Sequence, residues 1–284
     1  MVPITIFSEE FPGARVSAKA EFMNPGGSLK DRPVARMLLK AVERGELGEG
    51  KAILDSSSGN AGIAYAMFGR ALGCDVELVV PGNASEERLQ RMRAHGAIMT
   101  LTDPLEGYDE ALRKAHRRMD ERPEDYFFSD QYSNDDNWLA HYENTSVEIL
   151  RQAQEITHFV CGIGTGGSIT GISRRLKEEN SNVVVVCVKP ERFPGIEGLK
   201  PIGEREDIVP DILDNLLIDH YIDVTADKAR EMCHRLALQS LFVGQSSGAY
   251  MAAVEKVLKE EPTSRVVTLL NDTGERYTST DLWK

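Results

Sequence analysis

The stretch HFVCGIGTGGSITGISRRLKEE, residues 158–179, is followed at 183–188 by VVVVCV. An apolar run leads into a glycine-rich turn, an amphipathic segment comes next, and a second, β-branched run closes the pattern. Valine-rich runs of this length are typical of strands buried on both faces of a parallel sheet. Two parallel strands need a crossover between them, which the amphipathic segment at about 167–180 can supply. The stretch therefore predicts a strand–helix–strand unit of an α/β protein.

The same alternation recurs on both sides of this unit. Strands that alternate with helices indicate a parallel sheet covered by helices on both faces. The most irregular stretch is about 189–215, rich in proline, glycine and charge, and is either a flap over a site or a long surface loop. The further strands expected are 51–57, 74–82, 97–103, 126–130, 221–225 and 265–272, and the further helices are 61–73, 85–96, 107–121 and 226–240.

The composition narrows the class of protein. With 284 residues and 41% apolar side chains, the chain is long enough for one large or two modest cores. It has no run of about eighteen apolar residues, and its start, MVPITIFSEEFPG, lacks the features of a signal peptide. We therefore expect a cytoplasmic protein that does not enter a membrane. The formal net charge of −12 argues against nucleic-acid binding.

Cysteine and histidine positions argue against disulfides and metals. The four cysteines form no CxxC pair, and Cys161 and Cys187 lie in runs expected to be core strands, where a buried thiol is favoured. The six histidines are scattered without the spacing of a metal site. We expect no metal.

Three loops carry candidate chemistry, and each lies next to the start of an expected helix. The first is NPGGSLKDR, residues 24–32, which precedes a helix-like segment with Pro33 near its first turn. This order places Lys30 at a helix N-terminus, where the helix dipole disfavours an ammonium group and helps keep the amine neutral. A neutral amine is what a Schiff-base lysine needs. An ordinary surface lysine is the alternative.

The second loop is SSSGNAG, residues 56–62. Its small residues leave backbone N–H groups accessible at a helix start, which favours the binding of a carboxylate. Capping of the following helix by Ser58 or Asn60 is the alternative.

The third loop is GIGTGGS, residues 162–168, whose glycines allow backbone amides to surround a phosphate. The loop also matches GxGxxG, the pattern of dinucleotide-binding proteins. Those proteins place an acidic residue at the end of the next strand, whereas this strand ends in Lys189 and Pro190. The dinucleotide interpretation is therefore the weaker one.

Together these loops resemble those of the cysteine synthase family, which includes the catalytic cores of cystathionine β-synthases and belongs to the fold-type II pyridoxal-phosphate enzymes. NPGGSLKDR resembles the family's Schiff-base loop, SSGNAG its TSGNTG substrate loop and GIGTGGSITG its phosphate loop. QYSN at 131–134 resembles a second carboxylate-binding segment, and NDTGERY at 271–277 resembles the closing P-[SD]-S-G-E-R-Y element. The resemblance runs from about Pro3 to Trp283.

The resemblance implies a tryptophan synthase β-like fold. Two doubly wound, mostly parallel α/β domains would hold the cofactor, pyridoxal 5′-phosphate, in the cleft between them. We expect a smaller domain at 34–138 that carries the substrate loop. A larger domain, formed by 1–33 and 139–284, would carry the phosphate loop.

The resemblance also implies a role for each site residue. Lys30 would hold the cofactor as a Schiff base and move the Cα proton of the substrate. Asn60 would bond the ring hydroxyl, and Thr273 would face the pyridine nitrogen, where a hydroxyl suits β-elimination and replacement better than transamination. The phosphate would be held by Gly164, Thr165, Gly166, Gly167 and Ser168. The amino-acid carboxylate would be bound by Ser57, Ser58, Gly59 and Gln131.

The implied activity is β-replacement on an activated L-serine, with sulfide or another sulfur donor, to give L-cysteine. Ala61 stands where the family usually has threonine, and SSGNAG is also similar to the serine and threonine dehydratases. Net β-elimination, by a dehydratase or cysteine desulfhydrase, is therefore an alternative, and a non-catalytic protein that binds the cofactor and docks a partner is another. Expected partners are a second copy of the chain, a serine acetyltransferase tail or a sulfur-carrier protein.

KDRPVARM at 30–37 and EITHFVCGIGT at 155–165 resemble actinobacterial cysteine synthases that use O-phosphoserine rather than O-acetylserine. A phosphate leaving group needs a cation near the β-carbon. Lys200, in the irregular stretch 189–215, is the candidate for substrate binding there. A solvated lysine on a charged loop is the alternative.

GQSSG at 244–248 matches the nucleophile elbow of α/β-hydrolases. That fold requires a histidine downstream of the serine, and the last histidine of the chain is His234. We therefore interpret this segment as a structural turn near the cofactor.

Overall fold

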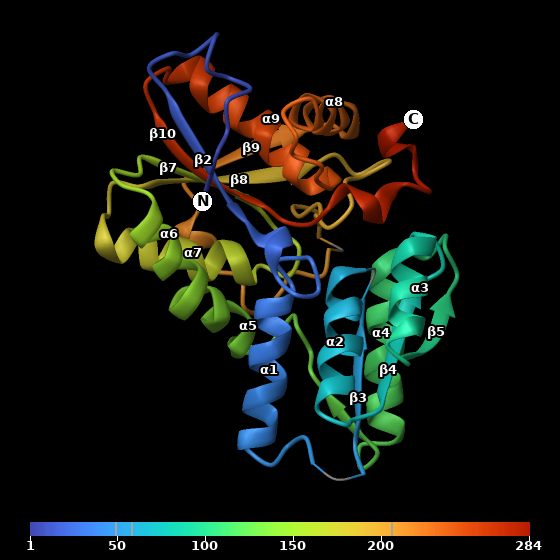
Figure 1. The fold of residues 1–284 in the computed structure, drawn as a ribbon. Helices are drawn as coiled ribbons and strands as arrows, with labels where there is room; N and C mark the ends of the chain where they lie inside the picture. The colour runs from blue at the N-terminus through green and yellow to red at the C-terminus, as the bar shows by residue number, and fades with distance from the viewer. Residues whose placement is uncertain (49, 58, 206) are drawn as a thin grey trace.

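Two β-sheets with helices packed against them form the computed structural model of the chain (Figure 1). The structure describes residues 1–48, 50–57, 59–205 and 207–284. The order of strands in the larger sheet is β1 (Val2–Pro3), β2 (Arg15–Ala20), β10 (Arg265–Leu270), β7 (His158–Gly162), β8 (Val184–Pro190) and β9 (His220–Val224). The order in the smaller sheet is β5 (Ile98–Thr102), β4 (Val76–Pro81), β3 (Ala52–Ser56) and β6 (Tyr126–Phe128).

The pairing of the strands is parallel except at one edge. Strand β1 runs antiparallel to β2, whereas β2, β10, β7, β8 and β9 are parallel to their neighbours. All pairs of the smaller sheet are parallel. The prediction of an α/β fold with mostly parallel sheets is therefore confirmed. The domain boundary at 34–138 stays a prediction, and the strands of the smaller sheet fall within it.

Helices cover both sheets, as parallel strands require. In Figure 1, α8 and α9 lie on one side of the larger sheet and α6 and α7 on the other, while α2, α3 and α4 surround the smaller sheet. The helices are α1 (Asp31–Glu43), α2 (Asn60–Ala71), α3 (Glu86–Ala94), α4 (Gly107–Glu121), α5 (Asp135–Ala140), α6 (Ser146–Gln152), α7 (Gly167–Glu179), α8 (Ala226–Ala237) and α9 (Gln245–Glu260).

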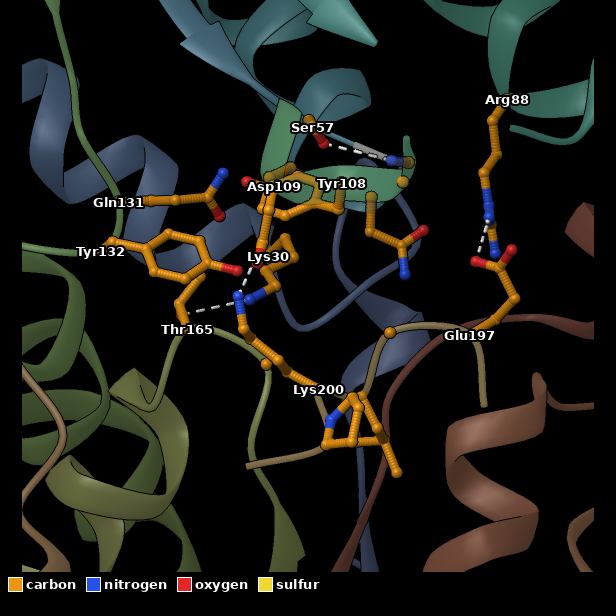
Figure 2. A pocket seen from close by; sticks show the side chains of 18 of the residues that line it. Lys30, Ser57, Arg88, Tyr108, Asp109, Gln131, Tyr132, Thr165, Glu197 and Lys200 are labelled. Atoms are coloured by element: carbon orange, nitrogen blue, oxygen red, sulfur yellow. Dashed lines mark hydrogen bonds and ion pairs between the residues drawn. The ribbon is translucent and has the colours of Figure 1, made fainter. Parts of the chain in front are cut away.

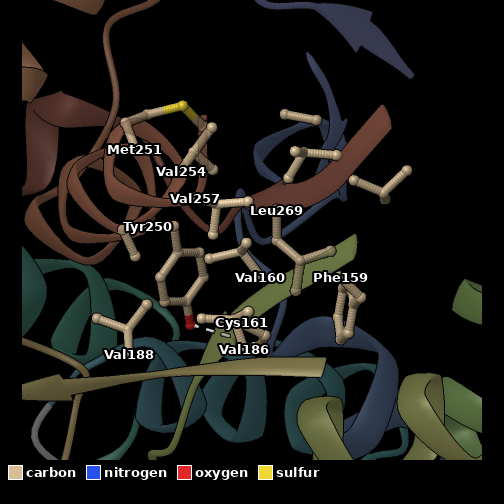
Figure 3. Close-up of a cluster of buried hydrophobic side chains, with 14 of the residues drawn as sticks. Phe159, Val160, Cys161, Val186, Val188, Tyr250, Met251, Val254, Val257 and Leu269 are labelled. Atoms are coloured by element: carbon tan, nitrogen blue, oxygen red, sulfur yellow. Dashed lines mark hydrogen bonds between the residues drawn. The ribbon is translucent and has the colours of Figure 1, made fainter. Parts of the chain in front are cut away.

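The strand–helix–strand unit predicted at 158–188 is β7, α7 and β8. Val160 pairs with Val186 and Cys161 with Cys187 in the register of these two strands. The four side chains are fully buried or nearly so, and both thiols are free, which confirms the predicted core position of the cysteines. Figure 3 shows α9 packed on the same strands. The side chains that α9 adds to this core include Tyr250, Met251, Val254 and Val257.

Several parts of the fold differ from the expectation or were absent from it, among them strand β1 and helices α5 and α6. The helix expected at 226–240 ends at Ala237, and the chain then turns through Ser240, whose φ is +66°. Strand β2 carries Arg15 and Lys19 and shows no long apolar run. It is held by the β10 ladder, in which Val16 pairs with Val266, so its strand character depends on a partner about 250 residues away.

None of the helices in the described ranges combines the length and the apolar character that a membrane crossing requires.

Gly171 determines how closely α7 approaches α5 and the segment that follows it, and this contact yields a stability prediction. A Cβ at Gly171 would overlap the carbonyl oxygen of Trp138 and lie 2.9 Å from the amide nitrogen of Tyr142. Overpacking of this kind costs about 1–3 kcal/mol, and helix propensity returns only about 1 kcal/mol for Gly→Ala. We expect Gly171→Ala to lower the free energy of unfolding, measured by urea titration. Gly48→Ala, where a Cβ meets nothing within 4 Å, is the control, and equal losses in both variants would contradict the packing argument.

Candidate active site

The loops singled out in the sequence meet at a cavity of about 400 Å³ (Figure 2). Its walls come from loops of both sheets. Gly166, Gly167, Ser168 and Thr273 are not among the residues that line the cavity, and Ser58 lies outside the described residues. The predicted site residues that do line it are Lys30, Ser57, Gly59, Asn60, Gln131, Gly164, Thr165 and Lys200.

Lys30 lies directly before α1, and its amine reaches the phosphate loop. Its Nζ donates a hydrogen bond to Thr165 Oγ1 at 3.4 Å. Burial lowers the pKa of Lys30 from its ordinary value of 10.5 to about 8, against the opposing influence of Cys161 and Asp55. The sequence suggested a neutral amine from the helix dipole alone, and burial is a cause that it did not reveal. The surface-lysine alternative is therefore wrong.

The third loop leads into the N-terminus of α7. Gly166 has a φ of +84°, a left-handed conformation that glycine adopts without strain. A Cβ at Gly167 would overlap Asn137 Oδ1, and one at Gly164 would lie 2.9 Å from the carbonyl oxygen of Gly198. Glycine is therefore required where the loop is crowded. The first N–H groups of a helix have no partner within it, so α7 offers donors suited to a phosphate.

Asn137, at the base of this loop, was not singled out in the sequence. Its Nδ2 donates to the carbonyl oxygen of Gln131 at 2.7 Å and to Thr165 Oγ1 at 3.0 Å. Because Thr165 Oγ1 accepts from both Asn137 and Lys30, its own proton is left for another acceptor such as a phosphate oxygen. Asn137 thus joins the 131–134 segment to the glycine-rich loop at 162–168.

The second loop is organised by Ser57. Its Oγ accepts hydrogen bonds from the backbone N–H groups of Gly59, at 3.1 Å, and Gly62, at 2.7 Å. The helix-capping oxygen is therefore that of Ser57, and the alternative that assigned capping to Asn60 is wrong, because α2 begins at Asn60 and Gly59 precedes it. The assignment to Ser58 lies outside the described residues. Gln131 is buried beside this loop, and its Nε2 donates to the carbonyl oxygen of Ser56 at 2.8 Å.

Asp55 lies under the same loop. It is fully buried, and its Oδ1 accepts from the backbone N–H of Ser56 at 2.7 Å. Burial raises the pKa of Asp55 to about 7. Because this carboxyl group can be neutral near pH 7, its burial costs less free energy than the burial of a charged carboxylate would.

Asn60 is held from both ends by residues of the C-terminal NDTGERY segment. Its Nδ2 donates to Asp272 Oδ2 at 2.7 Å, and its Oδ1 accepts from Arg276. Tyr277 also donates to Asp272 Oδ2, at 2.8 Å. The sequence directed attention to Thr273, whose backbone pairs with Val243. Asp272 precedes Thr273 in the same motif, but the sequence does not indicate its contact with Asn60, because that contact depends on the fold.

The 189–215 stretch lies against the cavity rather than apart from it. Lys200 is only 12% exposed, and its Nζ donates to Asp109 Oδ1 at 2.6 Å and lies 5.4 Å from the ring centroid of Tyr132. The solvated-lysine alternative for Lys200 is therefore wrong. Arg192 and Glu197 of the same stretch also line the cavity, which favours the flap interpretation over a simple surface loop.

The GQSSG segment is structural. Ser246 Oγ accepts from Asn271 Nδ2 at 3.0 Å, and Ser247 Oγ accepts from the Asn271 backbone N–H at 2.9 Å. Both hydroxyls thus fix the end of β10 next to the NDTGERY segment. Gly244 precedes α9 and residues 245–248 form its first turn, so the segment is the start of a helix and the prediction of a structural turn is wrong. The hydrogen bonds of both hydroxyls to Asn271 give the segment a structural role.

These residues fit pyridoxal phosphate. A buried amine of lowered pKa suits its aldehyde, a glycine-rich loop at a helix N-terminus suits its phosphate, and the cavity of about 400 Å³ has room for a cofactor and a small amino acid. The individual residue roles stay predictions.

The lowered pKa of Lys30 yields a pH prediction. Only the neutral amine attacks an aldehyde, so the rate at which cofactor-free protein takes up pyridoxal phosphate should rise with pH, with its midpoint near 8, and then level off. Stopped-flow absorbance across the pH range measures this rate, with Lys30→Ala as the control that forms no covalent product. A midpoint near 10.5, the ordinary value of an exposed lysine, would contradict the assignment.

Comparison with known proteins agrees with this geometry. A family model described as "Pyridoxal-phosphate dependent enzyme" matches residues 1–272. A cysteine synthase of Aquifex aeolicus is 46% identical over 283 residues, which cover 97% of this chain and 86% of that protein.

Solved structures extend the comparison. A cysteine synthase from Entamoeba histolytica has a TM-score of 0.90 and 31% identity, with 99% of this chain and 87% of that chain covered. A hydrogen sulfide-producing enzyme has a TM-score of 0.88 and 32% identity, with 95% of this chain and 84% of that chain covered. The chain belongs to the family of pyridoxal-phosphate dependent enzymes, in the cysteine synthase group.

Proposed function

We propose that the protein makes L-cysteine by β-replacement, in which an activated L-serine loses its β-substituent and a sulfur nucleophile takes its place. The protein is a pyridoxal-phosphate dependent transferase of the cysteine synthase type. One observation carries the proposal: the Lys30 amine, the phosphate loop at Thr165 and the substrate loop at Ser57 and Gly59 share one cavity.

The cofactor is proposed to be held at four points in and beside this cavity. Lys30 would hold its aldehyde carbon, Asn60 its ring hydroxyl, and Thr273 would face its pyridine nitrogen. The phosphate would be held by Gly164, Thr165, Gly166, Gly167 and Ser168. When bound, pyridoxal phosphate supplies an electron sink for the bonds that break at the amino acid.

The chain's own residues would bind the substrate and move its proton. N–H groups at the start of α2, with the hydroxyl of Ser57 and the amide of Gln131, are proposed to bind the amino-acid carboxylate, and Ser58 belongs to the same proposal. Ser57 already accepts two backbone hydrogen bonds, so its O–H proton can be donated to a carboxylate. Lys30 Nζ, whose pKa is about 8, can accept the Cα proton when neutral and return it when charged.

The leaving group is proposed to be phosphate, from O-phosphoserine, and the ammonium of Lys200 is proposed to bind it. The ammonium of Lys200 faces the cavity and is paired with Asp109 at 2.6 Å. A phosphate in the cavity would compete with Asp109 for this cation, and the charge-assisted contact would strengthen as the leaving group gains charge. The ester group of O-acetylserine is neutral before reaction and leaves as acetate with a single charge, so it depends less on a cation.

Net β-elimination is the second candidate function. The structural similarity to a hydrogen sulfide-producing enzyme, at 32% identity, and the alanine at position 61 favour it. The proposal further includes a homodimer in the cytoplasm, and a serine acetyltransferase tail or a sulfur-carrier protein as partner.

Product analysis tests the proposed function. The holoenzyme is supplied with O-phosphoserine or O-acetylserine, with and without sulfide, and cysteine and pyruvate are measured. We expect cysteine as the main product with sulfide, and O-phosphoserine as the better substrate. Pyruvate formed at equal rates with and without sulfide would instead identify an eliminating enzyme, and no product under any condition would favour a non-catalytic protein.

The same assay with Lys200→Ala tests the leaving-group contact. A charge-assisted contact of roughly 2 kcal/mol corresponds to about thirtyfold in kcat/KM. We expect a loss of about that size for O-phosphoserine and little change for O-acetylserine. Equal small losses for both substrates would exclude this role of Lys200 and favour O-acetylserine.

A further inference from the structure

An ion pair between Arg88 and Glu197 stands between the reaction cavity and a second hollow. Arg88 Nη1 donates to Glu197 Oε2 at 2.7 Å, and Figure 2 shows the two side chains meeting at one side of the cavity. The second hollow has a volume of about 530 Å³. Glu197 lines both spaces, as do Tyr108 and Tyr277, whereas Arg88 lines the reaction cavity, so the pair is anchored to the common wall through Glu197.

Arg88 is fixed more tightly than a surface arginine. Its side chain is 3% exposed, and its guanidinium lies 4.6 Å from the ring centroid of Tyr277. A Cβ at Gly59 would come within 2.6 Å of Arg88 Cδ, so the arginine packs directly against the substrate loop. Its Nε is buried and has no hydrogen-bond partner among the described residues. Glu197 is the carboxylate that accepts a hydrogen bond from this buried cation, and Asp272 also helps to raise the pKa of Arg88.

The pair joins parts of the chain that belong to different sheets. Arg88 is on α3, beside the smaller sheet, whereas Glu197 lies in the 189–215 stretch. The backbone N–H of Glu197 donates to Gln245 Oε1 at 3.1 Å, which ties this point of the stretch to the start of α9. In the pair between Lys200 and Asp109, the 189–215 stretch supplies the cation and α4 supplies the carboxylate, the reverse of the arrangement at Arg88 and Glu197. The stretch is thus held across the cavity at two points.

We propose that Arg88 and Glu197 are a positioning pair that closes the reaction cavity against water and so sets the ratio of replacement to elimination. This inference rests on the proposed function. Loss of the β-substituent and the Cα proton leaves a three-carbon enamine. Addition of sulfide at Cβ and of a proton at Cα gives cysteine, whereas release of the enamine and reaction with water give pyruvate and ammonia. A closed cavity that excludes water favours the first outcome.

Glu197→Gln tests the inference in the holoenzyme, because it keeps the shape of the side chain and removes its charge. The pyruvate-to-cysteine ratio is measured at saturating sulfide, together with the melting temperature and the absorbance of the bound cofactor. We expect the ratio to rise several-fold. The control is Glu77→Gln, which removes the charge from a pair with Arg118, at 3.1 Å, whose side chains are 21% and 26% exposed and do not line the cavity. We expect its ratio to equal that of the wild type.

The possible outcomes are distinct. A Glu197→Gln enzyme that is slower but keeps the wild-type ratio would overturn the inference, because a merely structural role changes rate or stability without changing the partition. Should this variant fail to fold, Arg88→Gln carries the same expectation, since it removes the other charge of the pair. A wild-type enzyme that makes no cysteine would contradict the proposed function itself.

Discussion

The burial of one amine is the constraint on which the other features of the site depend. Lys30 lies where loops from both sheets meet, and burial lowers its pKa to about 8. Its Nζ donates a hydrogen bond to Thr165 Oγ1 at 3.4 Å, and Asn137 Nδ2 donates to the same oxygen. The crowding in the glycine-rich loop follows from the same convergence, because Gly164 lies against the carbonyl oxygen of Gly198 and Gly167 against Asn137. A site of this kind suits a cofactor that reacts with a neutral amine.

The cavity holds two lysines whose surroundings differ. Lys200 is paired with Asp109 at 2.6 Å, so its nitrogen is already held by a carboxylate. Lys30 has a hydroxyl as its neighbour instead. This difference separates the proposed roles, in which Lys30 is the nucleophilic amine and Lys200 a binding cation. It also explains why the charged residues of the 189–215 stretch matter, since they supply cations and carboxylates that face each other across one space.

The sequence was sufficient for the parts of the molecule that depend on local pattern. The alternation around β7, α7 and β8 predicts the sheet class, and the glycine loops predict which strand ends meet at the site. The parts that it could not predict depend on contacts between distant residues. Strand β2 is defined by its pairing with β10, Arg88 by its pairing with Glu197, and Asp272 by its bond to Asn60. No spacing within α3 distinguishes Arg88 from the other arginines of that helix.

The central claim is that Lys30 carries the cofactor, and borohydride reduction tests it most directly. Reduction of the holoenzyme fixes the cofactor onto the amine that holds it, and peptide mapping then identifies the lysine. The account predicts the label on the peptide that contains Lys30 and its absence from the peptide that contains Lys200, the other lysine that lines the cavity. A label on Lys200 or on any other lysine, or full activity in a protein without the cofactor, would contradict it.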